Sequence, residues 1–221
     1  MILAAGRGER MRPLTDRTPK PLLPVAGKPL IVWHLERLAR AGFRDIVINH
    51  AHLGDQIEAL LDDGSAWGVA IRYSVEPQGA LETAGGIAQA LPLLGDEPFL
   101  VVNGDIYCEW DFSLAHTALT APDLAHLVLV PNPPQHKAGD FVLHAGRVGD
   151  KGEPRLTFAG VGVYRPQLFA DIVRGQPAQL APLLRAAMAQ GLVGGELHSG
   201  RWVDVGTPQR LAELDTELRS L

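Results

Sequence analysis

The strongest constraint on the fold is an alternation of short apolar runs with amphipathic segments over the first half of the chain. Strand-like runs lie at 2–4, 46–48, 69–74 and 99–102, and helix-like segments between them lie at 29–41, 54–61 and 83–91. This order favours a mainly parallel sheet with helices on both faces. We therefore expect an α/β fold.

The second half of the chain is less regular. Its candidate strands lie at 127–130, 141–143, 147–148, 158–164 and 202–205, and its candidate helices at 166–174, 180–190 and 208–218. The residues His144-Ala145-Gly146 predict a turn that would pair two of these strands. Because no linker divides the chain, we expect one domain over residues 1–221.

Composition excludes several classes of protein. The chain has 221 residues, 46% of them hydrophobic and 20% charged, which is typical of a globular domain. Its net charge of -5 argues against nucleic acid as a partner. No apolar run is long enough for a membrane span, and the start lacks the pattern of a signal peptide. The one cysteine, Cys108, cannot form an internal disulfide and is interpreted as a core residue. Because the sequence shows neither a disulfide pattern nor a signal peptide, we expect a cytoplasmic protein.

The loop after the first strand carries the most informative residues. Gly6 and Gly8 would let the backbone approach a phosphate closely, and Arg10 and Lys20 would add positive charge. Such a loop belongs at the carboxyl end of a strand, where open α/β sheets bind ligands. A P-loop is excluded because no Gly-Lys-Ser/Thr occurs here, and a dinucleotide-binding loop because Met11 replaces its third glycine. A plain solvated surface turn is the remaining alternative.

The full pattern of this loop resembles the signature of nucleotidyltransferases that activate sugar 1-phosphates. The matching residues run from Gly6-Arg7-Gly8-Glu9-Arg10 through Pro13-Leu14-Thr15 to Pro19-Lys20, with further landmarks at 81–86, 103–105 and 202–207. The resemblance implies a Rossmann-like fold of the glycosyltransferase-A type, with a nucleotide-binding half over about 1–110 and a sugar-binding half over about 111–221. It also implies that Arg10 holds the triphosphate and that Lys20 bridges phosphates. The remaining nucleotide contacts that it implies are Leu3, Ala4, Ala5, Gly6, Gly8 and Glu9.

Two aspartates are candidates for a metal site. Asp105 ends an apolar strand, and Asp204 lies in the apolar segment Trp202-Val203-Asp204-Val205. Mg²⁺ commonly takes one or two carboxylates together with substrate phosphates. Either aspartate alone would be interpreted as a turn residue or a helix-capping residue. Together they match the metal-binding positions of the family that the chain resembles, so we expect Asp105 and Asp204 to hold Mg²⁺ and, with Arg10 and Lys20, to carry catalysis.

Base and sugar contacts are expected from other segments. Gln78 and Thr83, in a segment that follows a strand and opens a helix, are candidates for reading the base, and helix capping is an equal alternative for Thr83. By resemblance, Asn103, Asp140 and Gly160 are the sugar-side candidates. The eight histidines show no metal-binding spacing with Cys or carboxylate partners, so we expect structural or solvent-facing roles for them.

Among shorter members of this family, the chain is most similar to bacterial enzymes that transfer a uridylyl group from UTP to N-acetylmuramic acid 1-phosphate in cell-wall recycling. Mannose 1-phosphate guanylyltransferases and glucose 1-phosphate nucleotidyltransferases are the alternatives, and a non-catalytic nucleotide-sugar sensor is an alternative of another class. The expected partners are small-molecule substrates only, without nucleic acid or membrane. A monomer is compatible with the sequence, and no C-terminal β-helix is expected.

Overall fold

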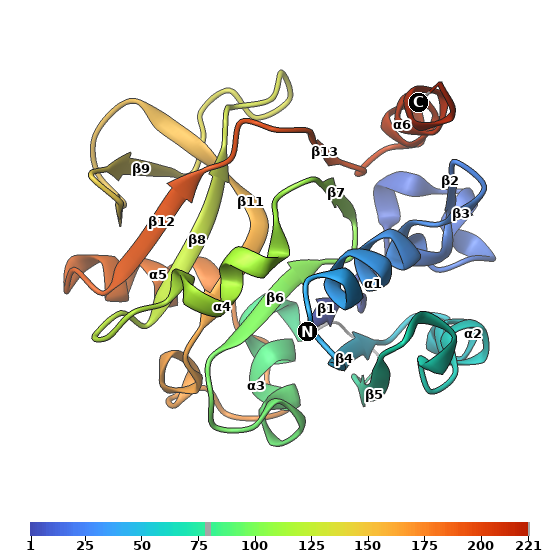
Figure 1. Cartoon of the computed structure of the whole chain (residues 1–221), viewed down its shortest axis with the longest axis horizontal. Coiled ribbons are helices and arrows are strands. Elements are labelled where there is room, and N and C mark those ends of the chain that lie inside the picture. Colours follow the sequence, from blue (N-terminus) through green and yellow to red (C-terminus); the bar gives the residue numbers. More distant parts are fainter. Residues whose placement is uncertain (78–80, 221) are drawn as a thin grey trace.

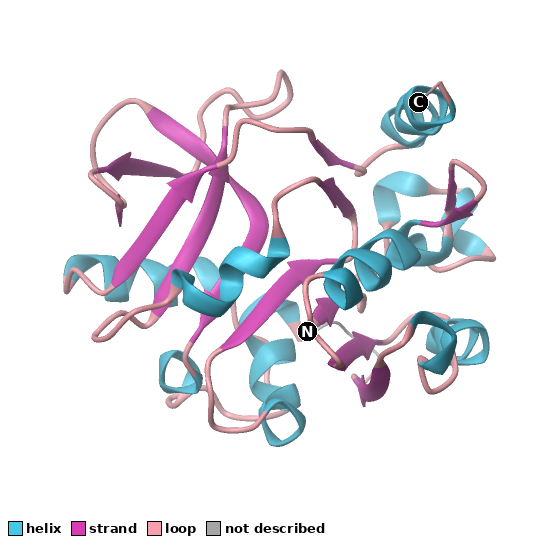
Figure 2. Cartoon of the chain, in the orientation of Figure 1, coloured by secondary structure: helices cyan, strands magenta, loops and turns pink. Residues whose placement is uncertain are grey.

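The computed structural model describes residues 1–77 and 81–220, and its centre is a mixed nine-stranded sheet with helices on both faces (Figures 1 and 2). From one edge to the other, the strands are β5 (Ala70–Val75), β4 (Asp45–His50), β1 (Ile2–Leu3), β6 (Phe99–Asn103), β11 (Arg155–Tyr164), β8 (Ala125–Val130), β12 (Val193–Leu197), β10 (Arg147–Gly149) and β9 (Phe141–His144). The expected α/β fold is confirmed.

The two halves of the sheet differ in strand direction. Strands β5, β4, β1 and β6 are parallel, as the strand–helix alternation predicts. Strand β11 runs antiparallel to β6 and to β8, and only β12 and β8 pair in parallel beyond it in the described sheet. Strands β9 and β10 form the hairpin expected at Ala145-Gly146, whose φ angles of 48° and 76° suit a two-residue hairpin turn.

One face of the sheet is covered by α1 (Leu30–Arg40) and α2 (Gly54–Leu61). Neighbouring strands place Ile48, Ile2, Val102 and Val161 side by side in register, and all four are fully buried. They belong to the same apolar core as the buried stripe of α1, which includes Leu35.

The opposite face is covered by α3 (Glu82–Leu94) and α5 (Leu180–Ala189). Ile87 and Leu184 of these helices belong to the apolar core on this second face of the sheet, together with the buried strand residues Val101, Leu127 and Leu129. Helices on both faces explain why the central strands read as continuous apolar runs without alternation.

A third apolar cluster lies outside the main sheet. It joins α6 (Pro208–Arg219) to the ribbon of β2 (Pro24–Val25) and β3 (Lys28–Pro29), which lie beside it in Figure 1. Helix α6 begins at Pro208, with Thr207 Oγ1 accepting the N–H of Arg210 at 3.3 Å. The helix expected at 208–218 forms, and its Leu211, Leu214 and Leu218 are buried against this cluster.

A small two-stranded sheet positions the end of β6. Strand β7 (Ile106–Cys108) pairs antiparallel with β13 (Trp202–Asp204), which places Asp204 opposite Ile106. The N–H of Val205 donates to the carbonyl of Asp105 at 3.0 Å. Two segments nearly a hundred residues apart are thereby fixed next to each other. The short helix α4 (Ala115–Ala118) follows β7.

Two local predictions were wrong. The segment 166–174 was expected to be helical, but only a 3₁₀ helix at Pro166–Phe169 forms. Strand β12 was not predicted, because Gly194-Gly195 reads as a strand breaker. A side chain at Gly195 would place its Cβ 2.7 Å from the carbonyl oxygen of Leu127, so glycine lets β12 pack against β8. Within the described residues, no helix has the length and apolar character of a membrane span.

Candidate active site

A cavity of about 340 Å³ opens at the carboxyl ends of the parallel strands. Leu3 lies level with Asn49 and Asn103 on the neighbouring strands, so the chain leaves all three strands at one edge. The lining consists of Leu3, Ala4, Ala5, Gly6, Gly8, Glu9, Arg10, Met11, Lys20, Pro21, Asn49, Glu76, Glu82, Thr83, Asn103, Asp105 and Gly206. The glycine loop therefore forms one wall of a pocket, which favours the ligand-binding interpretation over a plain solvated turn.

The loop is shaped by its two glycines in different ways. Gly8 has a φ of 70°, and a Cβ there would lie 3.0 Å from the Thr15 methyl group and 3.3 Å from Lys20 Cβ. The buried Thr15 hydroxyl donates to the Gly8 carbonyl at 2.9 Å and fixes the turn. Gly6 is exposed, and a Cβ there would meet no atom within 4 Å. Gly8 therefore serves the turn, whereas Gly6 leaves open space facing the cavity.

Lys20 and Asp105 form an ion pair in this cavity. Lys20 is only 7% exposed, and its Nζ lies 2.5 Å from Asp105 Oδ2. The close approach of β6 to β1 depends on Gly104, whose N–H donates to the Leu3 carbonyl at 2.8 Å. A Cβ at Gly104 would lie 2.6 Å from that same oxygen. A glycine is thus required immediately before Asp105.

Asp204 and two arginines converge around Gly206. Arg210 Nη1 lies 2.9 Å from Asp204 Oδ2, which holds that carboxylate from the side of α6. A Cβ at Gly206 would lie 2.4 Å from Arg210 Nη2, 2.9 Å from Asp204 Oδ1 and 3.1 Å from Arg10 Nη2. The absence of a side chain at Gly206 allows these groups to gather at the border of the cavity.

A second cavity, of about 200 Å³, adjoins the first. Asn103 and Asp105 line both cavities, and Asp204 and Gly160 line only the second. Gly160 has a φ of 75°, and a Cβ there would lie 2.8 Å from Asn103 Nδ2. The other lining residues are Ile106, Pro133, Gln135, His136, Thr157, Phe158, Ala159 and Trp202. Asp105 therefore stands at the junction of two adjoining binding spaces.

The two aspartates suit a divalent cation that also binds substrate phosphates. Their side chains are 40% and 26% exposed for Asp105 and Asp204, so water and phosphate oxygens can reach them. Within the described chain, no three His, Cys, Asp or Glu side chains form a complete metal cage. Mg²⁺ characteristically takes few carboxylates and completes its shell with water and phosphate oxygens, and the donor set fits this habit.

Most of the site residues predicted from sequence border these two cavities. Gln78 lies outside the described residues. Thr83 lines the first cavity, and no side chain caps the start of α3. Asp140 borders neither cavity; its Oδ1 lies 2.9 Å from His136 Nε2, and its Oδ2 accepts the N–H of Phe158 at 2.8 Å. Asp140 therefore contacts His136 from outside the cavity lining, and His136 is one of the histidines for which a structural or solvent-facing role was expected.

Sequence reasoning missed a buried polar chain beneath the first cavity. Asn49 Oδ1 accepts the N–H of Ala4 at 2.9 Å, and Asn49 Nδ2 donates to Glu76 Oε1 at 2.6 Å. Glu76 Oε2 accepts the N–H of Leu81 at 3.1 Å. This chain connects the glycine loop to the segment that opens α3. The available signal was a polar residue near the carboxyl end of each strand, Asn49 in β4 and Glu76 directly after β5.

Glu82 has a backbone conformation uncommon for its residue type. Its φ is 56°, and it lies at the start of α3 on the lining of the first cavity. Glycine adopts this conformation without strain, whereas a residue with a Cβ rarely does. Cys108 behaves as expected of a core residue, because it is buried and burial raises the pKa of its thiol to about 11.

The sequence matches a known protein family over nearly its whole length. The sequence model of the family described as "Nucleotidyl transferase" matches residues 1–220. The chain belongs to the nucleotidyl transferase family. Among curated members of this family, N-acetylmuramate alpha-1-phosphate uridylyltransferase of Neisseria meningitidis is 62% identical over 96% of this chain and 95% of its own length. The protein of the same name from Caulobacter vibrioides is 39% identical over 99% of this chain and 95% of its own length.

Solved structures of other proteins have the same fold as this nucleotidyl transferase. A Bacillus anthracis protein crystallised with sucrose superposes with a TM-score of 0.84 at 23% identity, over 100% of this chain and 94% of its own. HddC of Yersinia pseudotuberculosis, complexed with GMP-PN, gives a TM-score of 0.81 at 20% identity, over 98% and 97% of the two chains. At these identities, the likeness establishes the shared architecture.

Proposed function

We propose that this enzyme transfers a uridylyl group from UTP to N-acetylmuramate 1-phosphate, releasing pyrophosphate and forming UDP-N-acetylmuramate. The choice of substrates rests on the relative from Neisseria meningitidis, which is 62% identical and bears that activity in its name. The second such relative, at 39% identity, supports the same choice. The product belongs to cell-wall recycling in the cytoplasm.

The observation that carries the proposal is the pair of adjoining cavities that meet at Asp105. The first has a glycine loop with Arg10 and Lys20, which suits a triphosphate. The second, which lacks the loop, suits the sugar 1-phosphate. Two substrates in these spaces would bring their phosphates together beside one carboxylate.

The reaction then needs no covalent intermediate on the protein. A phosphate oxygen of the sugar 1-phosphate forms a bond to the α-phosphorus of UTP. The bond from that phosphorus to the bridging oxygen breaks, and its electron pair leaves with pyrophosphate. Both substrates are anions, so the main task of the protein is to hold them in line and to offset their charge.

Each charged residue has a separate part in this task. Backbone N–H groups from Ala5 to Gly8 and the guanidinium of Arg10 bind the triphosphate, and Lys20 offsets charge at the reacting phosphates. Asp105 and Asp204 hold Mg²⁺, which, when bound, supplies Lewis-acid stabilisation of the developing charge. Lys20 and Arg210 form ion pairs with these two carboxylates.

The test crosses four nucleotides with four sugar 1-phosphates and measures pyrophosphate release. UTP, GTP, dTTP and ATP are each combined with the 1-phosphates of N-acetylmuramate, N-acetylglucosamine, glucose and mannose. We expect the highest kcat/KM with UTP and N-acetylmuramate 1-phosphate. Efficient turnover with only GTP and mannose 1-phosphate would refute the substrate assignment, and nucleotide binding without any pyrophosphate would indicate a sensor.

A further inference from the structure

One side chain in the second cavity has no part in the reaction described above. His136 lines this cavity, and its side chain is 41% exposed. Its Nε2 lies 2.9 Å from Asp140 Oδ1, while Asp140 Oδ2 accepts the backbone N–H of Phe158 in β11. The ring is therefore held from behind by a carboxylate that is itself anchored to the sheet.

Charge distinguishes His136 from the other residues of this lining. Of the described residues that line the second cavity, the ionisable ones are Asp105, Asp204 and His136. The first two are carboxylates, and their partners Lys20 and Arg210 lie outside this lining. His136 is therefore the one described group on this wall that can present a positive charge to a substrate.

The loop that carries His136 is fastened to the sheet as well. Asn132 Nδ2 donates to the carbonyls of Lys137 and Arg155 at 3.1 and 2.9 Å, and Asn132 Oδ1 accepts the Thr157 hydroxyl at 2.9 Å. These bonds close the loop over β11. A binding group held in place before the ligand arrives loses less conformational entropy on binding, so this loop is suited to recognition.

We propose that His136 binds the carboxylate of the lactyl substituent of N-acetylmuramate 1-phosphate and thereby selects it over N-acetylglucosamine 1-phosphate. This inference rests on the proposed function. The two sugars share the ring, the acetamido group and the phosphate, and the carboxylate on the lactyl ether is the charged group that differs. Doubly protonated, the imidazole donates from Nε2 to Asp140 and keeps Nδ1–H for the substrate carboxylate.

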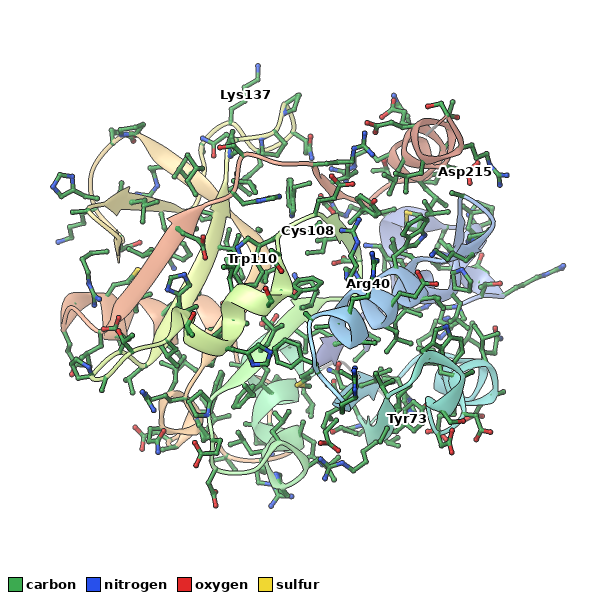
Figure 3. All side chains as sticks on the ribbon, viewed as in Figure 1. Arg40, Tyr73, Cys108, Trp110, Lys137 and Asp215 are labelled. Carbon is green, nitrogen blue, oxygen red and sulfur yellow. The ribbon has the colours of Figure 1, made fainter. Side chains whose placement is uncertain are left out.

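The experiment compares wild-type enzyme with His136→Gln, using UTP and each of the two sugar 1-phosphates. Glutamine retains a hydrogen-bonding side chain but cannot carry charge. The matched control is Lys137→Ala, which removes the neighbouring cation, whose side chain projects away from the body of the molecule (Figure 3). Pyrophosphate release gives kcat and KM for each sugar.

We expect His136→Gln to raise the KM for N-acetylmuramate 1-phosphate about ten- to a hundredfold, the usual range for losing a hydrogen bond to a charged group. The kcat should change less than about twofold, and kinetics with N-acetylglucosamine 1-phosphate should stay within about twofold of wild type, as should Lys137→Ala with both sugars. Equal losses with both sugars would show a structural role and overturn the inference.

Two further outcomes separate this inference from the proposed function. Unchanged kinetics of His136→Gln with N-acetylmuramate 1-phosphate would refute the role of His136 and leave the proposed function standing. Failure of the wild-type enzyme to use N-acetylmuramate 1-phosphate, with efficient use of another sugar 1-phosphate, would overturn both.

Discussion

Replacing Gly6 by alanine should separate substrate binding from stability. The Cβ of Gly6→Ala would meet no protein atom within 4 Å, and Gly6 lies outside the left-handed region that penalises side chains. The free energy of unfolding should therefore stay within about 0.5 kcal/mol of wild type. The new methyl group would stand in the cavity, where the backbone must approach a phosphate.

The expected loss for Gly6→Ala is one charge-assisted hydrogen bond between backbone and phosphate, or about 1.5–3 kcal/mol. This corresponds to roughly a ten- to a hundredfold fall in kcat/KM for UTP. Pyrophosphate release and urea unfolding measure the two quantities on the same preparation. Gly8→Ala is the contrast, because φ of 70° and the 3.0 Å approach to Thr15 should lower both stability and activity. Wild-type UTP kinetics in Gly6→Ala would refute the phosphate-binding role of this loop.

Three other substitutions test the supports of the site. Gly104→Ala, whose Cβ would lie 2.6 Å from a backbone oxygen, should lower the free energy of unfolding by about 1–3 kcal/mol and reduce kcat, measured by urea unfolding and turnover. Glu76→Gln should lower the free energy of unfolding by about 1–3 kcal/mol and raise the KM for UTP, because an amide cannot accept both buried N–H donors; wild-type values would contradict this. Burial lowers the pKa of His34 to about 4, so the unfolded chain takes up this proton near pH 6.5 and the folded chain only near pH 4. The contribution of neutral His34 to the free energy of unfolding is complete above pH 6.5 and falls by about 2 kcal/mol between pH 7 and 5. The free energy of unfolding of His34→Gln, measured in urea at both pH values, should therefore fall by about 2 kcal/mol less than that of wild type.

Residues near the ends of the parallel strands were predictable from sequence. Apolar runs locate β1 and β6, and parallel order brings their carboxyl ends to one edge, where Gly6, Lys20 and Asp105 then meet. The placement of Asp204 beside this group needs the short β7–β13 sheet. A strand was expected at 202–205, but nothing in one sequence indicates that it pairs with β7. Only the family resemblance predicted that Asp204 would lie near Asp105.

Other parts of the site depend on contacts between distant segments. Asn49 and Glu76 lie near the carboxyl ends of two strands, and their bond to each other follows from the pairing of β4 with β5. His136 lies in a loop without helical or strand periodicity, and its place in the second cavity depends on bonds between that loop and β11. Strand β12 was not predicted because it contains Gly194 and Gly195. These glycines allow close packing against neighbouring strands, but in a single sequence they look the same as glycines in a turn.

The most direct test of the account is the turnover of Asp105→Ala at saturating UTP, sugar 1-phosphate and Mg²⁺. Asp105 is 40% exposed at the meeting point of both cavities, and its loss should lower kcat by at least about a thousandfold. Because the change also leaves the buried Lys20 without its ion-pair partner, circular dichroism must first show that the variant is folded. Asp96→Ala, an exposed aspartate before the amino end of β6, should keep wild-type kcat. A folded Asp105→Ala enzyme that turns over at the wild-type rate would contradict the central claim that this carboxylate holds the metal at the reacting phosphates.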